Sequence, residues 1–137
     1  MDRNETIGKP TEQMGVMQKN VLDTQVIEIF KSDKLRVTPE IAEVSGNGLI
    51  GFKAVGVDVR VFLPHQKLLL VIPGSGGKTE KVPDPYVFDL KADETKMFRA
   101  VDESTLVAYH AVRTVFNGYT EALSRPPVII IVQTADI

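Results

Sequence analysis

The sequence predicts an α+β domain, in which a mainly antiparallel sheet packs against one long C-terminal helix and a short N-terminal helix precedes it. Three observations predict this class. Residues 57–63 place apolar side chains at every second position, which is typical of a half-buried strand. Residues 68–72 form an unbroken apolar run, which favours a strand covered on both faces. Residues 104–123 repeat apolar side chains at spacings of three and four, which indicates a helix.

Length and composition are those of one soluble globular domain. The chain has 137 residues, of which 43% are hydrophobic and 25% are charged. It contains no cysteine, so disulfides, thiolate nucleophiles, zinc fingers and iron–sulfur sites are excluded. The formal net charge is −2 and the basic residues are dispersed, so nothing supports binding to nucleic acid.

The N-terminal part divides into an arm and the start of the domain. Residues 1–12 are polar and read as an arm outside the core, which leaves 13–137 as a single domain. Apolar residues at helical spacing predict a short helix over roughly 12–22. The β-branched and aromatic residues 26–30 then favour a strand, and 35–37 form a second short one.

The middle of the chain reads as strands joined by turns. An Asn-Gly pair at positions 47 and 48 predicts a type I′ hairpin turn after a strand over 41–44. Strands over 57–63 and 68–72 follow, then a Gly/Pro-rich loop over 73–85 and a strand over 86–90.

The C-terminal part predicts the long helix and a final strand. Asp102 or Ser104 is a good N-cap, and Arg125-Pro126-Pro127 ends the helix. Small or apolar residues also cover much of its other side, which predicts a second face for a partner. Residues 128–132 form the last strand, an apolar element suited to exchange between subunits.

One segment imitates a phosphate-binding loop. The run Gly74-Ser75-Gly76-Gly77-Lys78-Thr79 follows a predicted strand, as in nucleotide hydrolases. Ile72 stands where the first glycine of that motif belongs, and two prolines soon after Thr79 forbid the helix that would hold the phosphates. We therefore reject a nucleotide hydrolase and keep Lys78 and Thr79 as weak candidates for contact with an anion.

A second pattern suggests a metal-dependent nuclease. Asp58, Asp89 and Lys91 supply the residue types that converge on a metal in such enzymes, but no further carboxylate is placed with them. The two histidines have no partners at metal-ligand spacing, so no metal site and no cofactor are expected.

The function that we predict is that of a non-catalytic protein that associates with itself or docks on another protein. It would be a structural or accessory component of a larger assembly, a viral one among them. The expected interface residues are Tyr109, Arg113, Phe116, Val128 and Ile130.

The alternative is a small ligand-binding domain or a nuclease-like enzyme that uses Asp58, Asp89 and Lys91, with the Gly74–Pro85 loop over its pocket. Charged residues near the N-terminus stand where a signal peptide would need its apolar core, and no apolar run is long enough to span a bilayer. We therefore expect a cytoplasmic location and no contact with a membrane.

Overall fold

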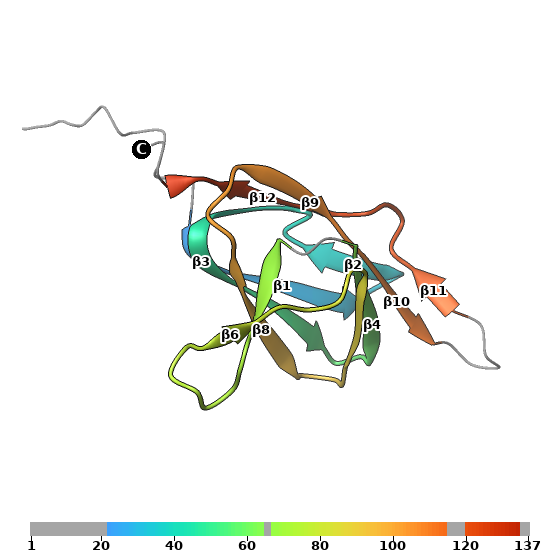
Figure 1. Cartoon of the computed structure of the whole chain (residues 1–137). Helices are drawn as coiled ribbons and strands as arrows, with labels where there is room; N and C mark the ends of the chain where they lie inside the picture. Colours follow the sequence, from blue (N-terminus) through green and yellow to red (C-terminus); the bar gives the residue numbers. More distant parts are fainter. Residues whose placement is uncertain (1–21, 65–66, 115–119, 135–137) are drawn as a thin grey trace, which may run out of the picture.

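Two β-sheets pack face to face in the computed structural model, which describes residues 22–64, 67–114 and 120–134 (Figure 1). In these residues the first sheet has the strand order β2 (Leu35–Thr38), β1 (Leu22–Lys31), β3 (Ile41–Val55), β8 (Thr95–Ala100), β5 (Leu68–Val71), β6 (Thr79–Glu80). Next to β3 lies β12 (Val128–Val132), and β9 (Thr105–Ala108) pairs with β12. The second sheet has the order β11 (Thr120–Ala122), β10 (His110–Thr114), β4 (Val59–Leu63), β7 (Tyr86–Leu90).

The core lies between the two sheets. Alternate residues of each strand point inward, as the period of two requires. Four aromatic residues occupy its centre, and the ring of Phe52 contacts the rings of Phe88, Phe98 and Tyr109 edge to face. Phe52 comes from the first sheet and Phe88 from the second, so the cluster joins both sheets.

The predicted α+β class is wrong, because no α-helix forms in the described residues. The predicted helix over 104–123 is replaced by β9, β10 and β11, with residues 115–119 outside the description. Val107, Tyr109 and Ala111 are buried at every second position, so the segment also satisfies the period of a strand. The segment is also rich in β-branched residues, which favour a strand over a helix.

The N-terminal predictions fall largely outside the description. The arm over 1–12 lies outside the described residues, and so does the short helix over 12–22 except for its last residue. That residue, Leu22, begins β1.

The predicted hairpin at residues 45–48 is also wrong, because β3 runs without a break from Ile41 to Val55. Asn47 has the positive φ of 65° that a turn would need, but it serves an irregularity within the strand. Before this point β3 pairs with β12, and after it β3 pairs with β1 and β8. Both β1 and β12 run parallel to β3, so the first sheet is mixed.

Side chains hold the irregular part of β3 in place. Ser45 Oγ donates to Asp23 Oδ1 at 2.9 Å, and Arg99 Nη1 donates to the Asn47 carbonyl at 2.6 Å. Gly46 lies against Asp102, whose Oδ1 accepts the backbone N–H of Thr134 at 2.8 Å. The bend therefore couples β1, β8 and the end of β12.

The other strand predictions are confirmed, in that each lies within or overlaps an observed strand. These are residues 26–30, 35–37, 57–63, 68–72, 86–90 and 128–132. The sequence analysis missed β8, whose segment alternates charged side chains with the buried Phe98 and Ala100.

Candidate docking face

Apolar side chains lie on the outer face of the first sheet where β9, β12 and β3 run side by side. The register places Val128 between Ala108 and Ile41, and it places Ile130 between Leu106 and the partly buried Glu43. Directly paired residues point to the same side of a sheet, so these side chains share one surface. We call Ile41, Leu106, Ala108, Val128 and Ile130 the outer patch.

The outer patch holds the two most exposed large hydrophobic side chains of the described residues. Ile41 is 62% exposed and Leu106 is 55% exposed. The alternate residues Val107 and Ile129 are fully buried on the inner side of the same strands. β9 and β12 are therefore largely apolar on both faces, and only the inner face is covered by the second sheet. Exposed apolar surface of this kind is the feature by which interaction sites are commonly recognised, and it makes the outer patch the candidate docking face.

The approach to the outer patch is open on the side of β9. This strand pairs with β12 along one edge, and no other described strand pairs with its second edge. Figure 1 shows β9 along the rim of the sandwich. Leu106 thus stands on an edge strand as well as on the exposed face.

The last strand does not have the free edge that the exchange hypothesis assumed. β12 lies between β3 and β9, and its backbone is paired on both sides. Val128 and Ile130 therefore have partly exposed side chains, while their backbone groups are already paired within the sheet.

The other predicted interface residues do not join Val128 and Ile130. Tyr109 is only 2% exposed and packs in the core. Phe116 lies outside the described residues. Arg113 is partly buried at the end of β10, where it contacts Glu121 of β11.

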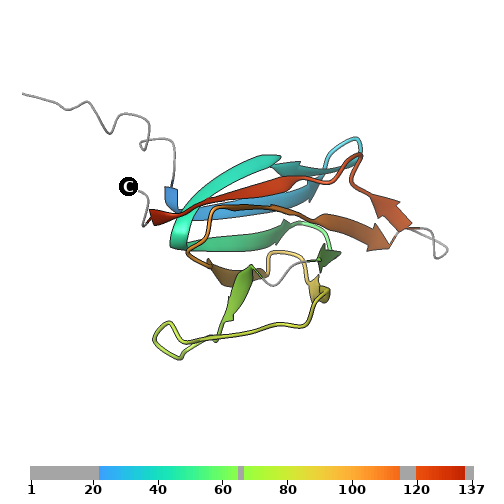
Figure 2. The ribbon, with the colours of Figure 1, turned by 45° about the horizontal axis from the view of Figure 1, so that its top comes forward.

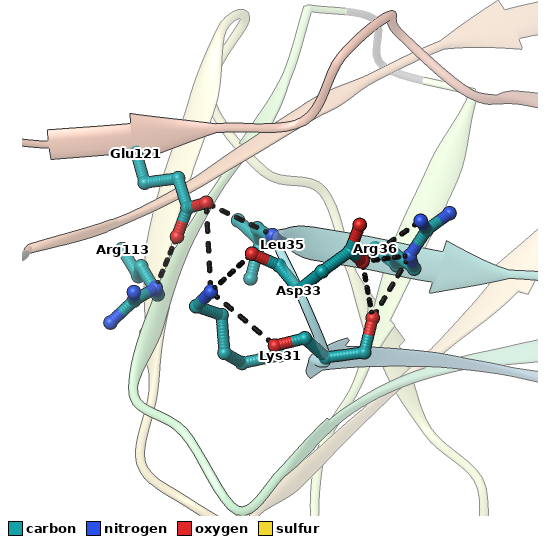
Figure 3. A network of polar contacts seen from close by, with 7 residues as sticks. Lys31, Asp33, Leu35, Arg36, Arg113 and Glu121 are labelled. Carbon is teal, nitrogen blue, oxygen red and sulfur yellow. Dashed lines mark hydrogen bonds and ion pairs between the residues drawn. The ribbon is translucent and has the colours of Figure 1, made fainter.

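Glu121 connects the two sheets (Figure 3). Its Oε1 accepts a hydrogen bond from Arg113 Nε at 2.6 Å, and its Oε2 accepts the backbone N–H of Leu35 at 3.3 Å. Lys31 Nζ lies 4.0 Å from the same Oε2. The Arg113 guanidinium, with help from the Leu35 N–H and Lys31, holds the pKa of the Glu121 carboxyl below its usual value. Arg113 therefore fixes the carboxylate of Glu121, and Glu121 in turn contacts Leu35 and Lys31 of the first sheet.

The Tyr109 hydroxyl is buried and has no hydrogen-bond partner among the described residues. Burial also raises the pKa of this phenol. A buried polar group without a partner costs about 1–3 kcal/mol. We expect Tyr109→Phe to raise the free energy of unfolding by about 1–2 kcal/mol, measured by urea unfolding followed by circular dichroism.

Tyr86→Phe is the matched control for this prediction, because Tyr86 is only half-buried and water can reach it. It should change the free energy of unfolding by less than about 0.5 kcal/mol. A loss of stability in Tyr109→Phe would show that the hydroxyl does have a partner, such as an internal water.

Asp58, Asp89 and Lys91 meet in one groove of about 550 Å³ on the outer face of the second sheet. Both oxygens of Asp89 accept hydrogen bonds from Arg60, at 2.7 Å from Nε and 3.1 Å from Nη2, and this pair lowers the pKa of the Asp89 carboxyl. Asp58 Oδ1 accepts the backbone N–H of Ala92 at 2.8 Å. The enzyme hypothesis stays a prediction, and Arg60 would have to release Asp89 before that carboxylate could act on a substrate or metal.

Lys78 and Thr79 lie at the hairpin between β5 and β6. Ile72 N–H donates to the Lys78 carbonyl at 2.8 Å, and Lys78 N–H donates to Ser75 Oγ at 3.0 Å. The loop extends away from the sandwich in both views (Figures 1 and 2). Its residues line neither the groove over the second sheet nor the smaller pocket described below.

Sequence reasoning missed Ile41 and Leu106 as surface residues. It placed Ile41 in a hairpin and Leu106 in the stripe of the predicted helix. One signal was present: residues 128–132 are apolar at every position, as in a strand that is apolar on both faces. Which residues flank such a strand depends on register between distant segments, and the sequence alone does not supply it.

Two packed sheets without an α-helix in the described residues define an all-β sandwich. The described residues contain no helix that is long and apolar enough to cross a membrane. No family model and no curated protein matches the sequence.

Two solved structures are similar to this chain. A reduced Cu(I) form of an amicyanin mutant at pH 4 is 12% identical with a TM-score of 0.43, over 79% of this chain and 81% of that one. Fet3p, a multicopper oxidase that functions in iron import, is 10% identical with a TM-score of 0.45, over 81% of this chain and 28% of that one. In the described part of this chain, no three His, Cys, Asp or Glu residues gather where they could hold a metal ion.

Proposed function

We propose that this chain is a non-catalytic structural protein that associates with a second copy of itself through the outer patch. The observation that supports the proposal most directly is the exposure of Ile41 and Leu106 in adjoining rows across three paired strands. Covering such a surface removes apolar area from water, at about 25 cal/mol per Å².

The geometry favours sheet-on-sheet contact between the copies. The outer patch is built from the same side chains, Leu, Ile, Val and Ala, that fill the core on the inner face of these strands. Two such faces pack about 10 Å apart when their side chains interdigitate. With a two-fold axis through the contact, the outer patch of one copy packs against the outer patch of the other, which is the commonest arrangement of a homodimer.

The charges around the patch favour a neutral partner such as a second copy. Next to Ile41, Arg125 Nη2 lies 2.8 Å from Glu40 Oε1, so that this exposed pair is neutralised within the chain. Near β9, Lys67 Nζ lies 2.9 Å from Glu103 Oε2 in the same way. Such pairs make up part of a polar rim, to which Glu43 beside Ile130 adds one negative charge. The formal net charge of −2 also sets little repulsion between two chains.

The test is the molar mass of the full chain, measured by sedimentation equilibrium from low to high micromolar concentration. We expect a dimer for the unchanged chain. Leu106→Arg should raise the dissociation constant of the dimer about 100-fold or more. In a two-fold dimer the substitution occurs twice, and each copy removes an apolar contact and adds a buried positive charge. Circular dichroism should show that the variant keeps its strands.

Val87→Arg is the matched control. Val87 is 44% exposed on β7, at the outer face of the second sheet. Its replacement by arginine therefore introduces the same charge away from the outer patch. It should leave the dissociation constant unchanged. A chain that stays monomeric at all concentrations, or a dimer that Leu106→Arg does not weaken, would overturn the proposal.

A further inference from the structure

A second feature of the surface is a pocket of about 350 Å³ between the β1–β2 corner and the segment that connects β11 with β12. Its floor is formed by the apolar residues Leu35, Val37 and Leu123, and each of them is less than a tenth exposed. Its rim is charged. The rim residues are Lys34, Arg36, Glu40, Ser124 and Arg125.

One carboxylate of the rim, that of Glu40, contacts Arg125 and lies in the field of two further cations. Arg125 donates to Glu40 Oε1 from Nη2 at 2.8 Å and from Nε at 3.3 Å. Arg36 and Lys34 stand close enough to act on the same carboxyl, and with Arg125 they hold the pKa of Glu40 below its usual value. Arg36 Nη2 also lies 2.9 Å from Asp33 Oδ1, so that Arg36 and Arg125 each have a carboxylate partner, and Lys34 adds one positive charge to the lining.

We propose that this pocket binds a small organic carboxylate with an apolar tail, and that Glu40 occupies the place of its carboxylate until the ligand arrives. The planar guanidinium of Arg125 can offer parallel N–H donors to a carboxylate, which a single ammonium group cannot do. The apolar floor takes the tail, and the volume lies in the range of known small-molecule sites.

The arrangement of charges makes Glu40 a competitor of the ligand. A bound carboxylate must replace Glu40 on Arg125. The free energy of the Arg125–Glu40 ion pair is then lost, and the affinity for the ligand is lower by that amount. Removing the Glu40 charge therefore tightens binding, whereas removing the Arg125 charge weakens it. A pocket that merely attracts apolar molecules would respond to neither change.

Octanoate is the probe, and its binding to the full chain is measured by chemical shift changes of the Leu35, Leu123 and Ser124 amides in ¹⁵N-labelled protein. We expect a dissociation constant of about 1 mM, as the size of this ligand allows. Glu40→Gln should tighten binding about fivefold, and Arg125→Gln should weaken it about tenfold. Acetate and octan-1-ol, which each carry half of the proposed chemistry, should bind more weakly than octanoate.

Lys78→Ala is the matched control, since it removes a positive charge from the β5–β6 loop, outside the pocket. It should leave octanoate binding unchanged. Shift changes that centre on the loop, equal binding of octan-1-ol, or weaker binding in Glu40→Gln would each overturn the proposal. Sedimentation of each variant keeps this outcome separate from self-association, because Glu40 and Arg125 also border the outer patch.

Discussion

Phe52→Ala should lower the free energy of unfolding by about 3–5 kcal/mol. Phe52 is fully buried, and its ring centroid lies 5.1 Å from that of Tyr109, 5.6 Å from that of Phe98 and 5.9 Å from that of Phe88. The neighbouring rings come from both sheets, so neither sheet can move inward alone to fill the space. A cavity therefore remains, and its lining loses dispersion contacts as well as the transfer free energy of the ring.

Urea unfolding followed by far-ultraviolet circular dichroism measures this loss, since the chain contains no tryptophan. Phe62→Ala is the matched control: Phe62 lies on β4 but is only half-buried on the outer face. It should cost about 1 kcal/mol, because water already reaches the site. Equal losses in the two variants would mean that the aromatic cluster does not connect the sheets.

Gly46→Ala should cost about 3 kcal/mol of stability, although it adds a single methyl group. A Cβ at position 46 would lie 2.7 Å from the Cα of Asp102 and would overlap its carboxylate. Asp102 cannot retreat freely, because its Oδ1 accepts hydrogen bonds from Thr134 N–H at 2.8 Å and Thr134 Oγ1 at 2.9 Å. The methyl group must therefore displace backbone or break these hydrogen bonds.

Gly56→Ala separates this effect from the general cost of replacing glycine. Gly56 has a φ of 68°, but its Cβ would meet nothing within 4 Å. The change should cost about 1 kcal/mol from the left-handed conformation alone. The same unfolding assay compares the two variants, and a Gly46→Ala loss no larger than that of Gly56→Ala would contradict the steric argument.

The sequence predicted most strands but not the fold class, and residues 105–114 show why. Their apolar positions fit a period of two as well as spacings of three and four, so the local pattern supports both a strand and a helix. The choice was made by distant partners: β9 pairs with β12 and β10 pairs with β4. Local periodicity carries no information about these partners.

The Asn-Gly pair at residues 47–48 shows a related limit. Its conformation was anticipated, because Asn47 does adopt a positive φ. Its consequence was not, since the same backbone geometry can reverse a chain or shift the register of a strand that continues. The neighbours Asp102 and Asp23, which hold the continued strand, are far from it in sequence.

The candidate site was predictable only in part. The sequence predicts Val128 and Ile130 as interface residues, and the structure sets Ile41 and Leu106 beside them on one surface. Tyr109 was chosen for a helix face that does not exist, and its place in the core follows from the strand period. Which side chains are neighbours on a sheet is decided by pairing between segments, and that pairing was the missing information.

The position of β3 between β1 and β12 has a consequence for how the chain acquires its structure. Residues 41–45 pair with residues 128–132, which follow them by more than eighty positions in the sequence. Both pairings of β3 with these strands are parallel, and the pairing with β12 joins segments that lie far apart in the sequence. Bringing distant segments together costs conformational entropy before their contacts form, and folds dominated by such pairings typically fold in milliseconds to seconds. The first third of β3 therefore cannot complete its pairing until residues 128–132 are available, so that this part of the first sheet is expected to form late in folding.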